Sequence, residues 1–311
     1  MFKHITYTTL ATIIGVSLSL TACSESNQTD NVIANSEQCT SAPKQVSVKS
    51  LDELNALFTE LNYTEKNWND STRDIPCLMF KKVSSKWVKN SPDLPVETKK
   101  TIFFRLMSPL ILMANEEILQ QRKVAIKAPL GSKALRELAL NYAVIKDLET
   151  PISEQLRSEL LSRIDIVPVS LALAQAAEES GWGTSRFALE GNAFFGQWDF
   201  SGNGMKPKQQ REHLGNYGVA KFDSPLASVK GYMFNINTNK AYANLRSLRA
   251  EMRDGESVIS GYELASTLDK YSERGEAYIK GLRRMIRVNK LQPLDEMKLD
   301  NRQVIALKTS K

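Results

Sequence analysis

Histidine is scarce in this 311-residue sequence, which contains only His4 and His213. A multi-histidine zinc site is therefore excluded, and a Ser-His-Asp triad could use only His213, because His4 lies in a segment that we expect to be removed. The three cysteines are too few for a four-cysteine metal site, and neither GxxxxGK[ST] nor GxGxxG occurs. Chemistry must then rest mainly on carboxylates and tyrosines, the side chains that glycosidases use, so we expect no cofactor and no metal.

Clustered basic charge is also missing. The formal net charge is +6 at pH 7, a mild excess that suits the surface of an anionic polymer. The sequence shows no zinc-finger, RNP or basic-zipper pattern, so we expect no nucleic-acid partner. It does not identify a protein partner.

Residues 1–22 have the pattern of a lipoprotein signal peptide. Lys3 precedes the apolar run LATIIGVSLSL, which is short for a membrane span and has the length of a signal-peptide core. The residues LTAC that end at Cys23 match the bacterial lipobox, which predicts acylation of Cys23. Ser24 is not the Asp that retains enterobacterial lipoproteins at the inner membrane, so we expect a membrane anchor at the periplasmic face of the outer membrane. The alternative is an ordinary secretory signal with a chance cysteine.

Residues 23–48 are polar and are predicted to form a flexible tether. If Cys23 is acylated, Cys39 and Cys77 remain as an even pair in an oxidising compartment, where a disulfide is expected. Two independent thiols are the alternative.

Residues 49–95 form a short N-terminal region, in which 50–63 are predicted to be a helix after a Ser cap. The segments PCLMF and SKWV are candidate short strands. Residues 96–148 are predicted to be a helical segment packed on the catalytic domain, with a long helix kinked at Pro109. Two further helices are expected near 132–147 and 152–163.

The stretch 168–198 places a carboxylate at a helix end. Pro168 suits a first helical position, the following residues are rich in Ala and Leu, and Gly181 and Gly183 follow closely. Glu179 therefore lies in the last turn, where the helix dipole and partial burial both disfavour its ionised form. A carboxyl that stays protonated near neutral pH can act as a general acid. A solvated side chain before a Gly cap is the alternative reading.

Glycines then interrupt residues 191–224, as in a small β-hairpin lobe. Helices are expected again at 225–236, 241–252, 257–271 and 276–288, and 295–311 look like a polar tail. The predicted fold is mostly α (α+β): a lysozyme-like helical domain at 149–294 with a β-hairpin lobe, preceded by a helical N-terminal region.

Two segments carry a family resemblance. AQAAEESGWGTS resembles the AQAALESGWG signature of glycoside hydrolase family 73, the glucosaminidases that cut bacterial cell-wall glycan, and GNAFFGQW is similar to that family's NNLFGIKW. Over residues 96–294 the chain resembles Bax-type bacterial proteins, which are unrelated to the apoptosis regulator.

The resemblance implies roles for several residues. The family's catalytic acid falls on Glu179, whereas Glu178 stands where the signature is apolar. YSERGEAYIKGLRRMI resembles YATDPNYAxKLxxMI, although it is one residue longer, which makes Tyr278 the active-site tyrosine and Tyr271 a support for the loop. A second family Glu on the hairpin matches Glu212 loosely.

Flat aromatic rings complement the C–H faces of sugars, so Trp198, beside Gln197, and Trp182 are candidate substrate-binding residues. Trp182 could instead be a core residue. For the second half of the reaction, either Glu212 activates water or the substrate's own acetamido group attacks with Tyr278 as polariser. The loose hairpin match favours the acetamido route.

These observations predict a lipid-anchored endo-β-N-acetylglucosaminidase that cleaves β-1,4 bonds of peptidoglycan glycan strands. A lytic transglycosylase or muramidase also places a catalytic Glu before Ser, but the usual downstream Gly-Leu-Met-Gln segment is absent. A non-catalytic glycan-binding lipoprotein is the other alternative.

Overall fold

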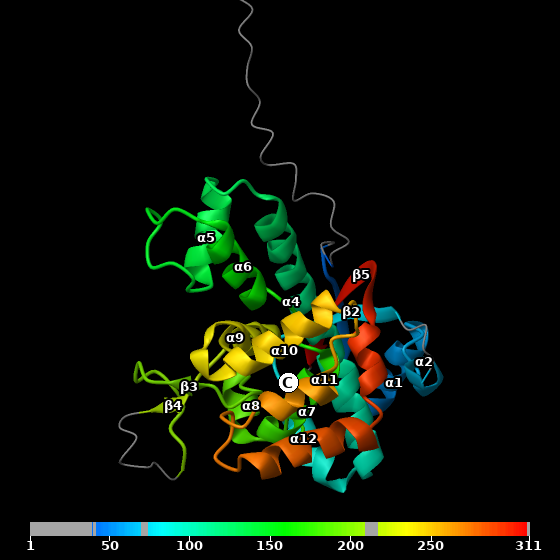
Figure 1. The fold of residues 1–311 in the computed structure, drawn as a ribbon. Coiled ribbons are helices and arrows are strands. Elements are labelled where there is room, and N and C mark those ends of the chain that lie inside the picture. The colour runs from blue at the N-terminus through cyan, green and yellow to red at the C-terminus, as the bar shows by residue number, and fades with distance from the viewer. Residues whose placement is uncertain (1–38, 40–41, 70–73, 209–216, 310–311) are drawn as a thin grey trace, which may run out of the picture. The chain divides into compact units, whose positions relative to one another are not determined.

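The computed structural model describes residues 39, 42–69, 74–208 and 217–309 (Figure 1). The helices are α1 (Leu51–Glu60), α2 (Glu65–Asn69), α3 (Ser85–Asn90), α4 (Val96–Lys127), α5 (Lys133–Asn141), α6 (Glu154–Arg163), α7 (Val169–Ser180), α8 (Arg186–Gly191), α9 (Pro225–Thr238), α10 (Ala243–Asp254), α11 (Gly261–Leu264) and α12 (Glu276–Val288), with 3-10 turns η1 (Ser91–Asp93), η3 (Lys240–Tyr242), η4 (Ala265–Thr267) and η5 (Gln292–Glu296). The strands are β1 (Lys44–Val48), β2 (Asp74–Phe80), β3 (Trp198–Asp199), β4 (Gly218–Val219) and β5 (Lys298–Thr309). The predicted mostly helical class with a small β component is confirmed. Within the described ranges no helix is both long and apolar enough to cross a membrane.

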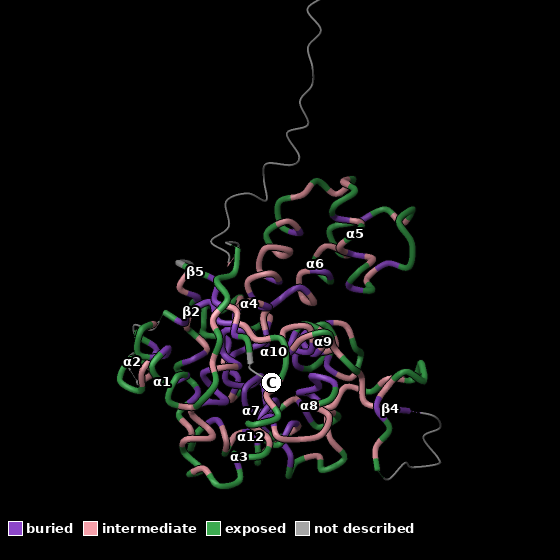
Figure 2. The backbone as a smooth tube through the Cα atoms, turned by 180° about the vertical axis from the view of Figure 1, so that it is seen from behind, coloured by how far each residue is buried: buried purple, intermediate pink, exposed green. Residues whose placement is uncertain are grey.

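Helix α7 lies at the centre of the helical part, in contact with α4, α11, α12 and η5 (Figure 1). Ten of its twelve residues are buried, and Ala172, Ala174, Ala176 and Ala177 give it a thin profile. Small side chains let neighbouring helices approach closely, so α7 can be surrounded on most sides. Figure 2 shows the buried backbone gathered around α7, while the outer end of α5 is largely exposed.

Both ends of α7 are held by specific contacts. At its start the Asp295 carboxylate accepts hydrogen bonds from the Ser170 N–H (2.8 Å), the Ser170 hydroxyl (2.8 Å) and the Gly261 N–H (2.9 Å). A Cβ at Gly261 would lie 2.2 Å from the Ser170 hydroxyl, so only glycine fits there. At its end Gly181 adopts φ 57°, the left-handed cap predicted from the sequence. The position of the last turn of α7 is therefore fixed from both sides.

Several predicted helices have different bounds in the structure. Pro109 lies inside α4 without ending it, and the Ser108 hydroxyl donates to the Phe104 carbonyl (2.8 Å). The helix predicted for 132–147 ends at Asn141. The helix predicted for 257–271 is wrong: only α11 and the turn η4 form, because the hydroxyls of Ser266 and Thr267 bond to the carbonyls three residues before them.

Residues expected to be a polar tail, 295–311, instead contribute the middle strand of a parallel sheet with the order β1-β5-β2. Val304, Ile305 and Leu307 are buried, and Leu78 of β2 pairs with Ile305. Because Lys, Asn, Arg and Gln residues flank this short apolar group, the sequence pattern did not predict a strand here. Strand β1 likewise falls in the segment predicted to be a tether, and SKWV forms helix α3 rather than a strand, so both predictions are wrong there.

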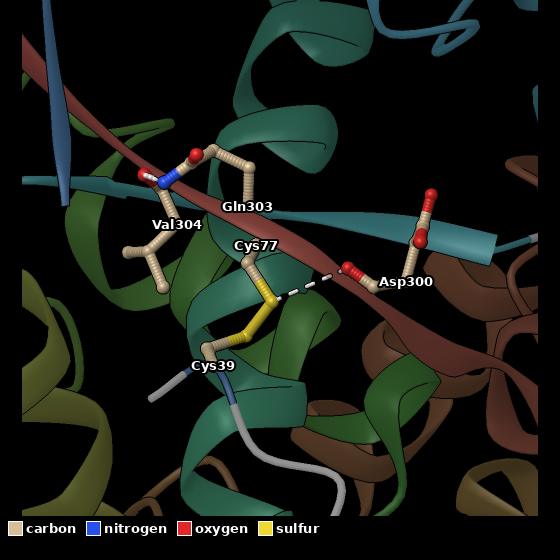
Figure 3. Close-up of a disulfide and its surroundings, with 5 residues drawn as sticks. All are labelled: Cys39, Cys77, Asp300, Gln303 and Val304. Atoms are coloured by element: carbon tan, nitrogen blue, oxygen red, sulfur yellow. Dashed lines mark hydrogen bonds between the residues drawn. A yellow bond between two sulfur atoms is a disulfide. The ribbon is translucent and has the colours of Figure 1, made fainter. Parts of the chain in front are cut away.

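The sulfurs of Cys39 and Cys77 are joined in a disulfide with a Cα–Cα distance of 6.0 Å (Figure 3). Cys77 is buried on β2, and its sulfur lies 3.5 Å from the Asp300 carbonyl oxygen of β5. The bridge therefore attaches the segment before β1 to β2, the strand at the opposite edge of the sheet. Cys23 lies outside the described residues.

A buried charged cluster connects α6, α9, α10 and the segment between α6 and α7. The Arg249 guanidinium is fully buried and donates to the carbonyls of Ser162 (2.9 Å), Asp165 (3.0 Å) and Ile166 (2.8 Å) and to the Asn237 side chain (2.8 Å). Burial lowers the pKa of Arg249 to about 10, and nearby Asp165 opposes that shift. If Arg249 were removed, the Ser162 and Ile166 carbonyls would lose this side-chain donor, whereas the Asp165 carbonyl would keep its hydrogen bond from the Asn237 amide (2.9 Å).

We expect Arg249→Leu to lower the free energy of unfolding by about 3 kcal/mol, because it removes the guanidinium that donates to the buried carbonyls of Ser162 and Ile166 and to the Asn237 side chain. Urea unfolding followed by circular dichroism measures the change. Arg284→Leu is the matched control, since Arg284 is exposed on α12 and should change the value by less than about 0.5 kcal/mol. Equal losses in the two variants would contradict a stabilising role for the cluster.

Candidate active site

The Glu179 side chain is half-buried in the last turn of α7. Its Oε1 accepts a hydrogen bond from the Tyr278 hydroxyl at 3.0 Å. Its Oε2 faces Gly196, where an added Cβ would lie 3.4 Å away, and Gly196 has φ 60°, which favours glycine. A longer side chain at this position would lie against the carboxyl group. One oxygen of Glu179 is thus held by a phenol, and the other borders a backbone without a side chain.

A chain of polar contacts reaches Glu179 through the core. The Tyr232 hydroxyl donates to Gln175 Oε1 (2.5 Å), and Gln175 Nε2 donates to the Tyr278 oxygen (3.1 Å). Gln175 is fully buried on α7, four residues before Glu179, so it lies on the same helix face. Because the Tyr278 oxygen accepts from Gln175, its own hydrogen is directed at Glu179. The carboxyl oxygen that carries an acidic proton is then Oε2.

Two aromatic stacks support this chain from behind. The rings of Tyr271 and Tyr278 are parallel, with centroids 5.5 Å apart, and the Tyr271 hydroxyl donates to the Phe195 carbonyl (3.0 Å). Phe195 itself stacks on Tyr232 at 4.0 Å. Tyr271 therefore joins the α12 side of the site to the residues just before Gly196.

The pKa of Glu179 is raised above its ordinary range, and burial is the largest cause. The hydrogen bond from Tyr278 opposes the shift, the Glu178 charge adds to it, and the Arg274 charge opposes it. Burial also raises the pKa of Tyr278, with the Glu179 charge as the next cause, so this phenol stays protonated and remains a donor. The pair can therefore supply a protonated carboxyl and then stabilise its conjugate base.

Glu178, the acidic departure from the apolar position of the signature, is paired in the structure. Its carboxylate accepts from the Arg274 guanidinium at 2.7 Å, and the Arg274 carbon lies 5.1 Å from the centre of the Tyr278 ring. Arg274 thus contacts both the acidic neighbour and the phenol that binds Glu179. The extra negative charge beside the site is largely balanced.

An aromatic surface lies on the two-stranded sheet β3-β4. Trp198 of β3 stacks on Tyr217 with a centroid distance of 4.7 Å, and Phe200 lies 5.8 Å from Trp198. Trp198 is 49% exposed and Phe200 67% exposed. Exposed rings such as Trp198 and Phe200 are suited to stack on sugar faces, and the buried Tyr217 supports Trp198 by stacking on it. We name Trp198, Phe200 and Tyr217 the aromatic platform.

Trp182 and Gln197 occupy different surroundings. Trp182 packs edge-on against Phe103 (5.6 Å) and Phe104 (5.4 Å) of α4, which matches its alternative assignment as a packing residue. The Gln197 side chain packs closely against α9, since a Cβ added at Gly231 would lie 3.0 Å from its amide nitrogen. Its Oε1 is buried without a hydrogen-bond partner among the described residues. This buried oxygen is not exposed on the surface that carries the platform.

The chemistry available at the site is acid catalysis by a carboxyl group. Across the described ranges, no group of three or more His, Cys, Asp and Glu side chains could hold a metal ion. Glu212, the predicted second carboxylate, lies outside the described residues, so its place relative to Glu179 stays a prediction.

Four contributors were not foreseen: Gln175, Tyr232, Arg274 and Phe200. The spacing of four to Glu179 could have identified Gln175, and the exposed WDF segment could have identified Phe200. The contacts of Tyr232 and Arg274 with the site depend on long-range packing, and no local pattern marks them.

Comparison with known proteins agrees with this geometry. The family model Glucosaminidase, described as mannosyl-glycoprotein endo-beta-N-acetylglucosaminidase, matches residues 155–291, a span that contains Glu179 and Tyr278 and belongs to a family of peptidoglycan hydrolases. Protein bax of Escherichia coli (strain K12) is 31% identical over 187 residues, which cover 58% of this chain and 66% of that protein, just under two thirds of its length. No solved structure matches the chain. Residues 155–291 therefore form a glucosaminidase-family domain, and over 187 residues the chain is similar to a Bax-type protein.

Proposed function

We propose that this chain is an endo-β-N-acetylglucosaminidase that hydrolyses β-1,4 bonds in peptidoglycan glycan strands, with Glu179 as the general acid. The observation that carries the proposal is the half-buried Glu179 carboxyl, whose Oε1 is bonded to Tyr278 while Oε2 borders Gly196. Glycosidic cleavage needs a carboxylic acid that is still protonated at the working pH, and the raised pKa of Glu179 meets that need.

Each part of the site has a role in this reaction. Glu179 Oε2 donates its proton to the leaving oxygen of the glycosidic bond, and the Tyr278 hydroxyl stabilises the carboxylate that remains. The aromatic platform provides apolar faces for the pyranose rings of the strand.

For the second half of the reaction we favour attack by the substrate's own acetamido group. The neighbouring carboxylate Glu178 is held by Arg274 and is therefore poorly placed to activate water. The Tyr278 hydrogen points at Glu179, so Tyr278 acts on the acid rather than as the acetamido polariser that the sequence suggested. The anomer of the early product, observed by NMR, decides this point: retention supports the acetamido route, whereas inversion supports water activated by Glu212.

Glu179→Gln should reduce hydrolysis of purified sacculi by on the order of a hundredfold or more, because the amide has nearly the same shape but cannot donate the proton. Mass spectrometry of the digest measures the products, and reducing N-acetylglucosamine ends are expected from the wild type. Glu178→Gln is the control and should keep most of the activity. Reducing muramic ends or anhydro-muramic ends would instead identify a muramidase or a lytic transglycosylase, and equal activity of wild type and Glu179→Gln would indicate a glycan-binding protein.

The pH profile should respond in opposite directions to two neighbouring variants. A general acid works only while protonated, so the rate falls as the pH rises through the pKa of Glu179. Glu178→Gln removes a charge that raises this pKa and should move the basic limb of kcat/KM to lower pH. Arg274→Gln removes a charge that lowers it and should move that limb to higher pH. Shifts in the same direction would contradict the assignment of Glu179 as the titrating acid.

The proposed location is the periplasmic face of the outer membrane, through a lipid on Cys23. The support is the lipobox sequence LTAC after an apolar run. Wild-type protein should incorporate radiolabelled palmitate in growing cells, and Cys23→Ser should not, because the thiol is the acylated group. Absence of label in the wild type would refute the anchor without affecting the proposed hydrolysis.

A further inference from the structure

An apolar cavity of about 210 Å³ lies beside the parallel sheet, away from the residues assigned to glycan cleavage. Its walls come from β1, α1, β2, α3, α4, β5 and the segments that contain Gly183 and Phe194. The buried apolar side chains among its walls include Leu54, Ile102, Phe103, Met107, Phe194 and Leu307. An apolar cavity of about 150 Å³ already binds benzene, so this one has room for a short stretch of alkyl chain.

Three lysines also line the cavity. Lys49, Lys82 and Lys86 are exposed, and none forms an ion pair with another described residue. Their amino groups therefore give the edge of an apolar cavity a positive charge. The combination fits a molecule with an apolar tail and an anionic head.

The recessed walls favour a narrow ligand over a protein surface. Most of the apolar side chains around the cavity are buried or half-buried, and strongly exposed ones such as Val96, Phe200 and Phe234 do not line it. A protein partner usually meets an exposed apolar patch, whereas an alkyl chain can enter a recess. The long stems of Lys49, Lys82 and Lys86 can keep their charged ends in water above such a chain.

We propose that this cavity binds a single-chain anionic amphiphile, with its alkyl tail against the Ile102, Phe103 and Met107 wall and its acidic head among Lys49, Lys82 and Lys86. A fatty acid and a lysophospholipid share this chemistry. The site goes beyond the proposed hydrolase function and does not depend on it. Its ligand would contact Gly183, in the turn that ends α7, and Trp87, whose indole N–H donates to the Trp182 carbonyl at 3.3 Å.

Binding is tested with the full-length protein by isothermal titration calorimetry, with sodium laurate below its critical micelle concentration. Saturable binding at one site per chain is expected. The variant Lys49→Glu/Lys82→Glu/Lys86→Glu should weaken laurate binding about tenfold or more, because three attractive charges become repulsive. Lauroyl-lysophosphatidylglycerol serves as the second probe: tighter binding than laurate identifies a phospholipid-derived ligand, and weaker binding identifies a free fatty acid.

The matched control is Lys66→Glu/Lys81→Glu/Lys89→Glu, which makes the same change in charge at exposed lysines of the same region that do not line the cavity. It should leave the affinity unchanged. Val83→Glu places a carboxylate in the cavity wall and should abolish binding of laurate and weaken that of neutral monolaurin. No saturable laurate binding, equal weakening in both triple variants, or equal affinity for dodecyltrimethylammonium would overturn the proposal, whatever the activity on sacculi.

Discussion

The burial of α7 is the constraint on which the rest of the structure depends. A helix that is buried along most of its length must have small or apolar side chains, and α7, which contacts α4, α11 and α12, contains four buried alanines. The chain leaves this burial at the last turn, where Gly181 and Gly183 turn it away and the Glu179 side chain becomes partly accessible. The depth of Glu179, and with it the direction of its pKa shift, follows from where the helix ends.

Burial of polar groups beside this helix requires that each has a partner. The Gln175 amide accepts a hydrogen bond from Tyr232 and donates one to Tyr278, and the Tyr278 hydroxyl donates a hydrogen bond to Glu179. An apolar residue at 175 would leave the buried Tyr232 hydroxyl without its acceptor and the Tyr278 oxygen without its donor, which costs more than a lost surface hydrogen bond. The same contacts that make the core acceptable also orient the acid, so stability and chemistry share one network.

Sequence patterns within a few residues predicted the central part of the site, whereas features that depend on contacts between distant residues were missed. Pro168, the alanines and Gly181 act within a few residues of the helix they delimit, so α7 and the position of Glu179 could be predicted. By contrast, the sequence around Val304 and Ile305 resembles a polar tail until β1 and β2 are placed beside it. The role of Arg274 likewise depends on its contacts with Glu178 and Tyr278, which are distant in the sequence. The hydrogen bond from Trp87 to Trp182 also joins distant parts of the chain, so neither contact could be predicted locally.

The position of β5 between β1 and β2 has a consequence for the order of folding. The sulfur of Cys77 and the carbonyl of Asp300 lie side by side although 223 residues separate them. Until β5 is in place, β1 and β2 have no middle strand to pair with, and such non-local parallel pairing forms slowly. The Cys39–Cys77 bridge has a sequence separation of only 38 and needs none of those later residues. It can therefore keep β1 and β2 close together while the helical domain folds. Strand β5 then inserts between two strands that are already covalently connected.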